Sequence, residues 1–316
     1  MFVSLIIPTI VERKNELVRL LSSVASQKKI PDEVIIVMQG FGNNYVSAVA
    51  SIQQSFPMLT FVCIQSSIRS LTKARNEGVC KSRGDIIAFS DDDIILEPNY
   101  IEKMIHFFET YPKALGVQGL ITDFVEGHTK KIGGNSFVYA CYNVFAKIFL
   151  LNNSSTKNKL LLSGRSQYAT HVKTVTPCEW LSGIGAYRKS VFTEFTFDES
   201  LGGYALGEDK LFSYPINQTY PGVLYIDPSI RCKHVYGEQG RPKNEELVRM
   251  KVQNIHYIWN KLMSDRGFLA KIAFWWANIG DFISVFFASI LRVYSFRFFL
   301  LHVRAYFALI GHTYDT

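Results

Sequence analysis

The chain has 316 residues, of which 48% are hydrophobic and 14% aromatic, so it can bury a full core and is not a disordered chain. Its length allows one large domain with an appendage or two modest domains. It carries 34 Lys and Arg against 27 Asp and Glu, a balance that does not by itself choose between nucleic acid, anionic lipid and phosphorylated small molecules as partners.

The N-terminus and the cysteines indicate the compartment. The first apolar run carries no Lys or Arg and ends at Pro8, which is too short for the core of a signal peptide. The five cysteines are an odd number, and none lies in a Cys-x-x-Cys pair, which is typical of free thiols in a reducing compartment. We therefore expect a strand at the N-terminus and a protein that stays on the cytoplasmic side.

The first third of the chain alternates β-branched apolar runs with helical periodicity. The pattern predicts strands at residues 3–7, 34–38, 61–64 and 86–89, and helices at residues 17–24, 43–55, 70–82 and 101–108. Such alternation predicts an α/β fold with a mostly parallel sheet. Because ligands of these sheets bind beyond the carboxyl ends of the strands, the residues that follow Ile7, Met38 and Phe89 are the first candidates for a site. The less regular stretch 123–178 is predicted to be a mobile excursion from the sheet.

Three adjacent carboxylates, those of Asp91, Asp92 and Asp93, directly follow the strand predicted at 86–89. They repel one another unless a cation lies between them. At the end of a strand in an α/β sheet, the natural cation is Mg²⁺ or Mn²⁺ shared with phosphate oxygens, which would help a diphosphate to leave. A solvated acidic turn is the simpler alternative.

A second acidic pair, Glu208 and Asp209, follows a glycine-rich stretch that contains Tyr204. An acceptor hydroxyl is a poor nucleophile, and a positioned carboxylate that accepts its proton supplies general base catalysis. The alternative is the acidic first turn of an ordinary helix.

Further candidates lie elsewhere along the chain. Trp180 precedes the small residues Ser182 and Gly183, so a sugar ring could approach the backbone there and pack on the indole face. Arg75 could pair with a phosphate or with the aspartates, and His234 could be a neutral imidazole ligand of a metal. The alternative for the segment at Trp180 is a buried strand and turn. For Arg75 it is an ordinary amphipathic helix, and for His234 it is a structural histidine.

Taken in order, these segments resemble the family 2 glycosyltransferases, which have the GT-A fold. The resemblance covers about residues 2–240, and it rests on residues 4–9 with Arg13, 71–76, 87–93, 180–191 and 197–209, ending near His234. It implies an inverting enzyme that moves a sugar from a nucleotide-diphosphate sugar to an acceptor hydroxyl with a divalent metal, in polysaccharide or glycolipid assembly.

The resemblance also implies roles for the acidic residues. Asp91 and Asp93 match the outer carboxylates of the D-x-D motif, which meet the nucleotide ribose and the metal. Asp92 matches the middle residue, near the donor sugar or nucleotide. Asp209 matches the catalytic base of the Glu-Asp motif, and Glu208 supports it or the acceptor.

Other positions match the nucleotide and metal sites of the family. Pro8, Thr9 and Arg13 match part of the nucleotide pocket, and His234 matches a late histidine that completes the metal shell. At Gln39 many members instead have an acidic residue that reads the base. Gln39 can donate and accept hydrogen bonds, so it could still meet a pyrimidine edge, but this departure leaves the base open.

Two alternative functions stay open. A nucleotidyltransferase that makes the nucleotide sugar usually has a glycine-rich basic loop after the first strand, and none follows here. A non-catalytic saccharide-binding scaffold is opposed by the presence of both Asp93 and Asp209. Nucleic acid is not expected as a partner, since the basic residues form no stripe.

The domain from residue 1 to 240 precedes a helical region from 241 to 316. Its aromatic and cationic stretch, 268–310, is interrupted at Asp281 and is typical of helices in the lipid headgroup region. We expect a peripheral protein on the inner face of the cell membrane, with a saccharide or lipid-linked saccharide as acceptor. A tail packed on the catalytic domain, a homo-oligomer contact and a true membrane span are the alternatives.

Overall fold

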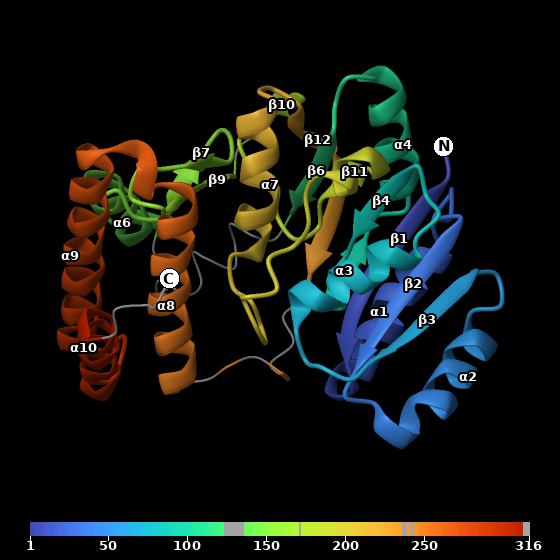
Figure 1. The fold of residues 1–316 in the computed structure, drawn as a ribbon, viewed down its shortest axis with the longest axis horizontal. Coiled ribbons are helices and arrows are strands. Elements are labelled where there is room, and N and C mark those ends of the chain that lie inside the picture. Colours follow the sequence, from blue (N-terminus) through green and yellow to red (C-terminus); the bar gives the residue numbers. More distant parts are fainter. Residues whose placement is uncertain (123–135, 171, 236–238, 241, 243, 312–316) are drawn as a thin grey trace. The chain divides into compact units, whose positions relative to one another are not determined.

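The computed structural model describes residues 1–122, 136–170, 172–235, 239–240, 242 and 244–311. The chain folds into two compact units (Figure 1). The first contains residues 1–128 and 170–240, and the second contains residues 129–169 and 241–316. The predicted boundary at residue 240 stays a prediction, and it does not anticipate the grouping of 129–169 with the C-terminal helices.

The first unit is built on a nine-stranded sheet with the order β10-β12-β6-β11-β4-β1-β2-β3, in which β5 also pairs with β12 (Figure 1). The strands are β1 (Val3–Ile10), β2 (Glu33–Gln39), β3 (Phe61–Ser66), β4 (Ile86–Phe89), β5 (Ile94–Leu96), β6 (Gly116–Ile121), β10 (Thr176–Pro177), β11 (Ala186–Arg188) and β12 (Leu224–His234). All residues of β2 are buried, as expected of a continuous apolar strand covered on both faces.

The helices of the first unit connect these strands. They are α1 (Lys14–Ala25), α2 (Tyr45–Ser55), α3 (Leu71–Lys81), α4 (Tyr100–Thr110) and α7 (Glu208–Thr219), with short 3₁₀ turns η1 (Val11–Arg13), η2 (Gly42–Asn44) and η3 (Lys189–Thr193). The strands and helices predicted in the first third of the chain are thereby confirmed, and the fold class is α/β.

The sheet is mostly parallel, as predicted, because β1 to β4, β6 and β12 run in one direction and β5, β10 and β11 run in the other. The strands β1 to β4 are parallel, but β11 lies antiparallel between β4 and β6, with Ala186 opposite Ala88 on one side and Val117 on the other. The amide of Phe89 donates to the carbonyl of Gly185. An antiparallel strand enters the sheet where its neighbour ends, so the residues just before β11 lie beside the residues just after β4.

The second unit contains helices and a small sheet. Its elements are α6 (Ser136–Ile148), β7 (Asn153–Ser155), β8 (Lys159–Leu160), β9 (Ser166–Ala169), α8 (Asn244–Leu262), η4 (Ser264–Arg266), α9 (Phe268–Ile290) and α10 (Phe296–Gly311), and the three strands pair in the order β7-β9-β8. The predicted excursion is therefore ordered structure over 136–169, and its first part, 123–135, lies outside the described residues.

Side chains of the C-terminal helices fix this middle segment. The indole N–H of Trp259 donates to the carbonyl of Leu162 at 3.0 Å, and the ring stacks on Phe274. Gly164 has a φ of +74°, and a Cβ there would lie 3.0 Å from the Cβ of Trp259. The indole N–H of Trp276 donates to the carbonyl of Ile148 at 2.9 Å. The segment and the helices thus share one core.

Candidate functional site

The aspartates that follow β4 meet residues from the end of β1. The two strands are parallel neighbours, so their carboxyl ends lie together. The hydroxyl of Thr9 donates to Oδ2 of Asp92 at 2.8 Å. The Nη1 of Arg13 lies 2.8 Å from Oδ1 of Asp92 and 3.2 Å from Oδ2 of Asp93. Arg13 therefore partly neutralises two carboxylates that would otherwise repel each other.

His234 reaches the same place from the far side of the sheet. It ends β12, where it stands opposite Ile94 in the antiparallel pair with β5. Its Nε2 lies 3.2 Å from Oδ1 of Asp93. The sheet thus brings together the predicted residues Asp93 and His234, which are 141 positions apart.

Arg75 joins the aspartates to the second acidic pair. Its Nη2 lies 3.1 Å from Oδ1 of Asp91, and its Nη1 lies 2.7 Å from Oε1 of Glu208. The side chain is only 2% exposed, and its guanidinium lies over the rings of Phe89 and Phe197. Of the two partners predicted for Arg75, a phosphate or the aspartates, the structure shows an aspartate, and it adds Glu208 as a second carboxylate.

Glu208 and Asp209 occupy the first turn of α7. Gly207, the residue before the helix, has a φ of +94°, a conformation that glycine adopts without strain. Glu208 is buried, whereas Asp209 is half-buried and its Oδ1 accepts a hydrogen bond from the amide of Lys210 at 2.8 Å. Of the two carboxylates, Asp209 is the one that a substrate can reach.

Burial changes the titration of two carboxyls in this cluster. Desolvation raises the pKa of Asp92 to about 6, although Arg13 and Thr9 favour its charged form. Desolvation also raises the pKa of Glu208 to about 8, opposed by Arg75 and reinforced by the charges of Asp209 and Asp91. Perturbed carboxyls gathered at a strand end are typical of a functional site.

The predicted metal ligands fit a divalent ion in kind. Asp91 and Asp93 supply oxygen and His234 supplies an imidazole nitrogen, donors that suit Mn²⁺. Within the described residues, no three acidic, histidine or cysteine side chains converge as a metal site. Instead, Asp93 contacts Arg13 and His234, and Asp91 contacts Arg75.

Three of the predicted sugar-binding residues have other neighbours. Trp180 is 0% exposed and the ammonium of Lys210 lies over its ring, so the expectation that its face packs on a sugar is wrong. The amide of Ser182 donates to Oε1 of Gln118 at 2.6 Å. A Cβ on Gly183 would lie 2.7 Å from Nη2 of Arg75, so the small residue makes room for this arginine. Tyr204 is 36% exposed and stays a candidate.

The residues predicted for the nucleotide pocket lie in or directly after β1 and β2, but the side chain of Gln39 already has a partner within the protein. Its Oε1 accepts the amide of Ser70 at 2.7 Å, and the side chain is buried. Pro8 is also buried within β1. One further residue could not be found from the sequence: the carbonyl of Gln239, 226 positions away, accepts Nε of Arg13 at 2.7 Å.

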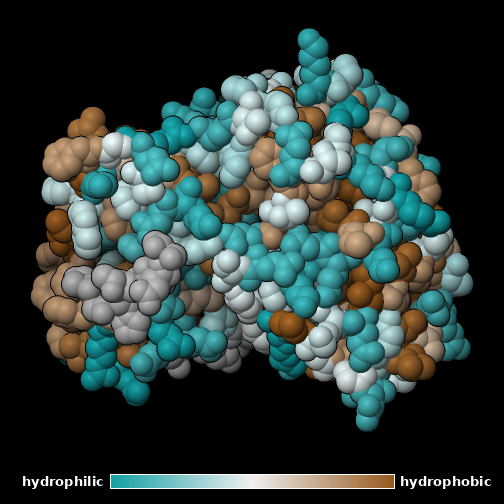
Figure 2. Space-filling view, viewed as in Figure 1, coloured by the Kyte–Doolittle hydropathy of each residue, from teal (hydrophilic) through white to brown (hydrophobic). Residues whose placement is uncertain are grey.

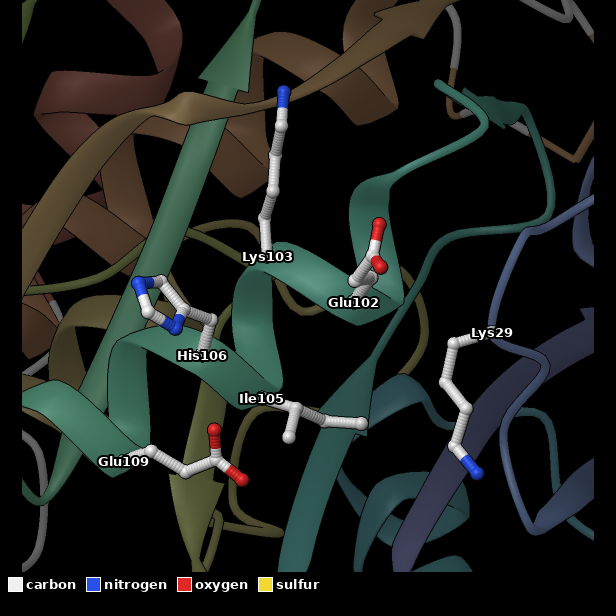
Figure 3. A pocket seen from close by; sticks show the side chains of 6 residues that line it. All are labelled: Lys29, Glu102, Lys103, Ile105, His106 and Glu109. Atoms are coloured by element: carbon white, nitrogen blue, oxygen red, sulfur yellow. The ribbon is translucent and has the colours of Figure 1, made fainter.

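A separate cavity of about 510 Å³ lies on α4 and the link between α1 and β2 (Figure 3). Its lining includes Glu102, Lys103, His106 and Lys29. Figure 3 shows that Lys103 and Lys29 point in opposite directions, so the charges do not gather at one point. It contains none of the residues singled out by the sequence.

The family described as "Glycosyl transferase family 2" matches the chain over residues 4–166. A glucosyl-dolichyl phosphate glucuronosyltransferase from Haloferax volcanii is 28% identical over 112 residues, 35% of this chain and 34% of that protein. The amylovoran biosynthesis glycosyltransferase AmsE from Erwinia amylovora is 28% identical over 115 residues, 36% of this chain and 43% of that protein. The matched part thus spans less than half of the length of either relative.

Solved structures resemble the fold over 80–99% of this chain at low sequence identity. The mannosyltransferase PcManGT from Pyrobaculum calidifontis, in complex with GDP-Man and Mn²⁺, has a TM-score of 0.57 and 14% identity over 99% of this chain and 87% of its own. GalNAc-T7 with UDP, GalNAc and Mn²⁺ has a TM-score of 0.57 and 14% identity over 89% and 54%. S. aureus TarS 1–349 with UDP-GlcNAc has a TM-score of 0.52 and 14% identity over 80% and 65%.

Proposed function

The chain belongs to glycosyl transferase family 2 and has a GT-A-like fold, and on that premise we propose that it moves a sugar from a nucleotide-diphosphate sugar to an acceptor hydroxyl with inversion of configuration. One observation carries the proposal. A single guanidinium, that of Arg75, contacts both Asp91 of the acidic triplet and Glu208 of the acidic pair. The two acidic groups therefore form one site at the carboxyl ends of the strands, where α/β sheets bind ligands.

Asp209 is the proposed general base. It takes the proton of the acceptor hydroxyl while the acceptor oxygen attacks the anomeric carbon from the face opposite the diphosphate. The bond between that carbon and the diphosphate oxygen breaks in the same displacement, so the configuration inverts without a covalent sugar–enzyme intermediate. Glu208, held by Arg75, keeps the first turn of α7 in place.

The donor binds at the end of β1 and β4. Thr9 and Arg13 hold Asp92, so that this carboxylate keeps one orientation toward the nucleotide or the donor sugar. Asp91, Asp93 and His234 would hold Mn²⁺ or Mg²⁺, which when bound neutralises the charge that develops on the leaving diphosphate. The Mn²⁺ bound by PcManGT and by GalNAc-T7 supports this assignment.

The acceptor is proposed to be a saccharide or a lipid-linked saccharide presented at the cytoplasmic face of a membrane. The two relatives support this class, since one is a glucosyl-dolichyl phosphate glucuronosyltransferase and the other is a glycosyltransferase of amylovoran biosynthesis. The reaction then belongs to polysaccharide or glycolipid assembly.

The test is a thermal-shift screen of nucleoside diphosphates, each with and without Mn²⁺, on the full chain. One base should raise the melting temperature more than the others, and Mn²⁺ should increase that shift. The variant Asp91→Asn should lose the dependence on Mn²⁺. If no diphosphate shifts the melting temperature with Mn²⁺ present, the proposed donor site is wrong.

A further inference from the structure

Helix α9 of the second unit exposes most of its large apolar side chains and buries mainly small and polar ones, together with Phe274 and Val285. The exposed residues, which we call the apolar stripe, are 36–76% exposed: Phe268, Leu269, Ile272, Trp275, Trp276, Ile279, Phe282, Phe286, Phe287 and Ile290. At 100° per residue they fall on one side of the helix along its whole length. The buried side includes Ala273, Ala277, Asn278 and Gly280. A helix whose outer face contacts water instead exposes polar side chains and buries the large apolar ones.

The polar residues on the buried side bind the rest of the unit. Asn278 accepts a hydrogen bond from Nη2 of Arg165 at 2.9 Å, and Tyr306 of α10 donates to Asn278 and to Asp281. Arg165 is 3% exposed and directly precedes β9. The middle of α9 is therefore fixed against the small sheet and α10.

This contact decides how the helix can lie in a membrane. The 23 residues of α9 are long and apolar enough to cross one, since they extend about 34 Å against a hydrocarbon core of about 30 Å. Crossing would place β9 and the edge strand β8, with the exposed Lys159, at the depth of the bilayer centre. Unpaired backbone groups and a charged side chain are costly there. The geometry therefore favours a helix that lies along the surface.

The charge distribution indicates which surface it meets. The second unit, residues 129–169 and 241–316, carries 16 Lys and Arg against 5 Asp and Glu, whereas the first unit carries 18 against 22. The basic charge of the chain is thus concentrated in the unit that bears the apolar stripe. Exposed cations, among them Lys271, Arg292 and Arg297, lie on α9 itself or just beyond it. Figure 2 shows tan and brown atoms along the edge where Figure 1 draws α9 and α10.

We propose that the second unit docks on an anionic lipid bilayer, with α9 parallel to the surface and the apolar stripe buried among the acyl chains. The cations contact lipid phosphates, which attract the unit to the surface before the stripe inserts. This deepens the proposed function by naming the surface that brings the chain to a lipid-linked acceptor. Docking needs no nucleotide sugar, so it can be tested apart from transfer.

The test is flotation of the full chain with vesicles of phosphatidylcholine alone or mixed with phosphatidylglycerol. Binding should be at least tenfold stronger to the anionic vesicles at low salt, and should weaken at high salt because ions screen the attraction. The double variant Trp275→Ser/Phe286→Ser should bind at least about tenfold more weakly, since burial of one such side chain is worth about that factor. The matched control Val46→Ser/Met58→Ser, at exposed apolar residues of the first unit, should bind like the parent chain.

Three results would overturn the proposal. The first is that the chain stays in solution with anionic vesicles at low salt. The second is that the parent chain forms a dimer and binds no vesicles, whereas the Trp275→Ser/Phe286→Ser variant is a monomer; the apolar stripe would then be covered by a second copy of the chain. The third is retention in vesicles after alkaline carbonate treatment, which would indicate a spanning helix. Loss of transfer by Asp209→Asn with unchanged flotation would leave docking intact.

Discussion

Arg75 and Glu208 form an ion pair in which Nη1 lies 2.7 Å from Oε1 and neither side chain is more than 8% exposed. The pair connects α3 with the first turn of α7, two elements separated by more than 120 residues of chain. The guanidinium of Arg75 also contacts Asp91. Arg75 therefore holds both the acidic triplet and the helix turn that carries Asp209, the proposed base.

Removing one partner of this pair should be far more damaging than removing a surface pair. Above pH 8, where the carboxyl of Glu208 is charged, the variant Arg75→Met leaves it buried without its cation, and we expect a loss of about 3–5 kcal/mol in the free energy of unfolding. The double variant Arg75→Met/Glu208→Gln should recover part of it. Urea unfolding of the three proteins gives the values. The exposed pair of Arg69 and Glu12 is the matched control, and Arg69→Met should cost less than about 1 kcal/mol. Equal losses for both arginines would contradict the prediction.

A methyl group on Gly183 should disturb the site through Arg75. The Cβ of Gly183→Ala would lie 2.7 Å from Nη2 of Arg75, which is held by two carboxylates and cannot move without losing them. We expect transfer to fall by at least about tenfold while the donor still binds, measured by the rate and by the dissociation constant. At Gly202 no heavy atom lies within 4 Å of an added Cβ, so Gly202→Ala should keep the stability of the parent chain.

The proposed base should be needed for transfer but not for donor binding. In Asp209→Asn the side chain keeps its size and loses the ability to take a proton, so the transfer rate should fall about 100-fold or more. Donor affinity, measured by calorimetry with Mn²⁺, should change little. Near-normal turnover by a folded Asp209→Asn protein would remove Asp209 from this role.

The buried Glu208 should make stability depend on pH. Folding raises the pKa of Glu208 from its ordinary 4.5 to about 8, so between these values the chain takes up a proton when it folds. The contribution of this group is fully present below pH 4.5 and is lost as the pH rises toward 8. Glu208→Gln cannot titrate, so its melting temperature relative to the parent chain should increase over this interval. A difference that is constant with pH would show that the carboxyl does not titrate there.

The sequence predicted those parts of the fold whose signal is local. The strand at 86–89 and its acidic triplet were readable because a buried β-branched run ends in three carboxylates. The sheet also placed Thr9 and His234 beside Asp92 and Asp93, as the carboxyl-edge argument implies. The contact of Arg75 with Asp91 was one of the two alternatives that the sequence left open, but its second partner, Glu208, could not be predicted because it lies 133 positions away in the chain.

Two other failures have a physical cause. Trp180 was assigned to a sugar because aromatic residues beside glycines occur both in binding sites and in cores, and only its 0% exposure separates the two. The short strands β7, β8 and β9 contain Asn, Ser, Lys and Gln, residues typical of loops. They form a sheet because the C-terminal helices supply the apolar partner, as Trp259 does for Leu162 and Gly164.

The position of β11 has a consequence for biosynthesis. A nascent chain that has emerged only to residue 180 already contains Asp91, Asp92 and Asp93, but the gap between β4 and β6 is unfilled until Ala186 to Arg188 leave the ribosome. The edges of β4 and β6 that will later pair with β11 then stay open to other unfinished chains until residues 186–188 have been translated. Slow codons or a pause before residue 186 should therefore increase aggregation, whereas the same pause after residue 234 should not.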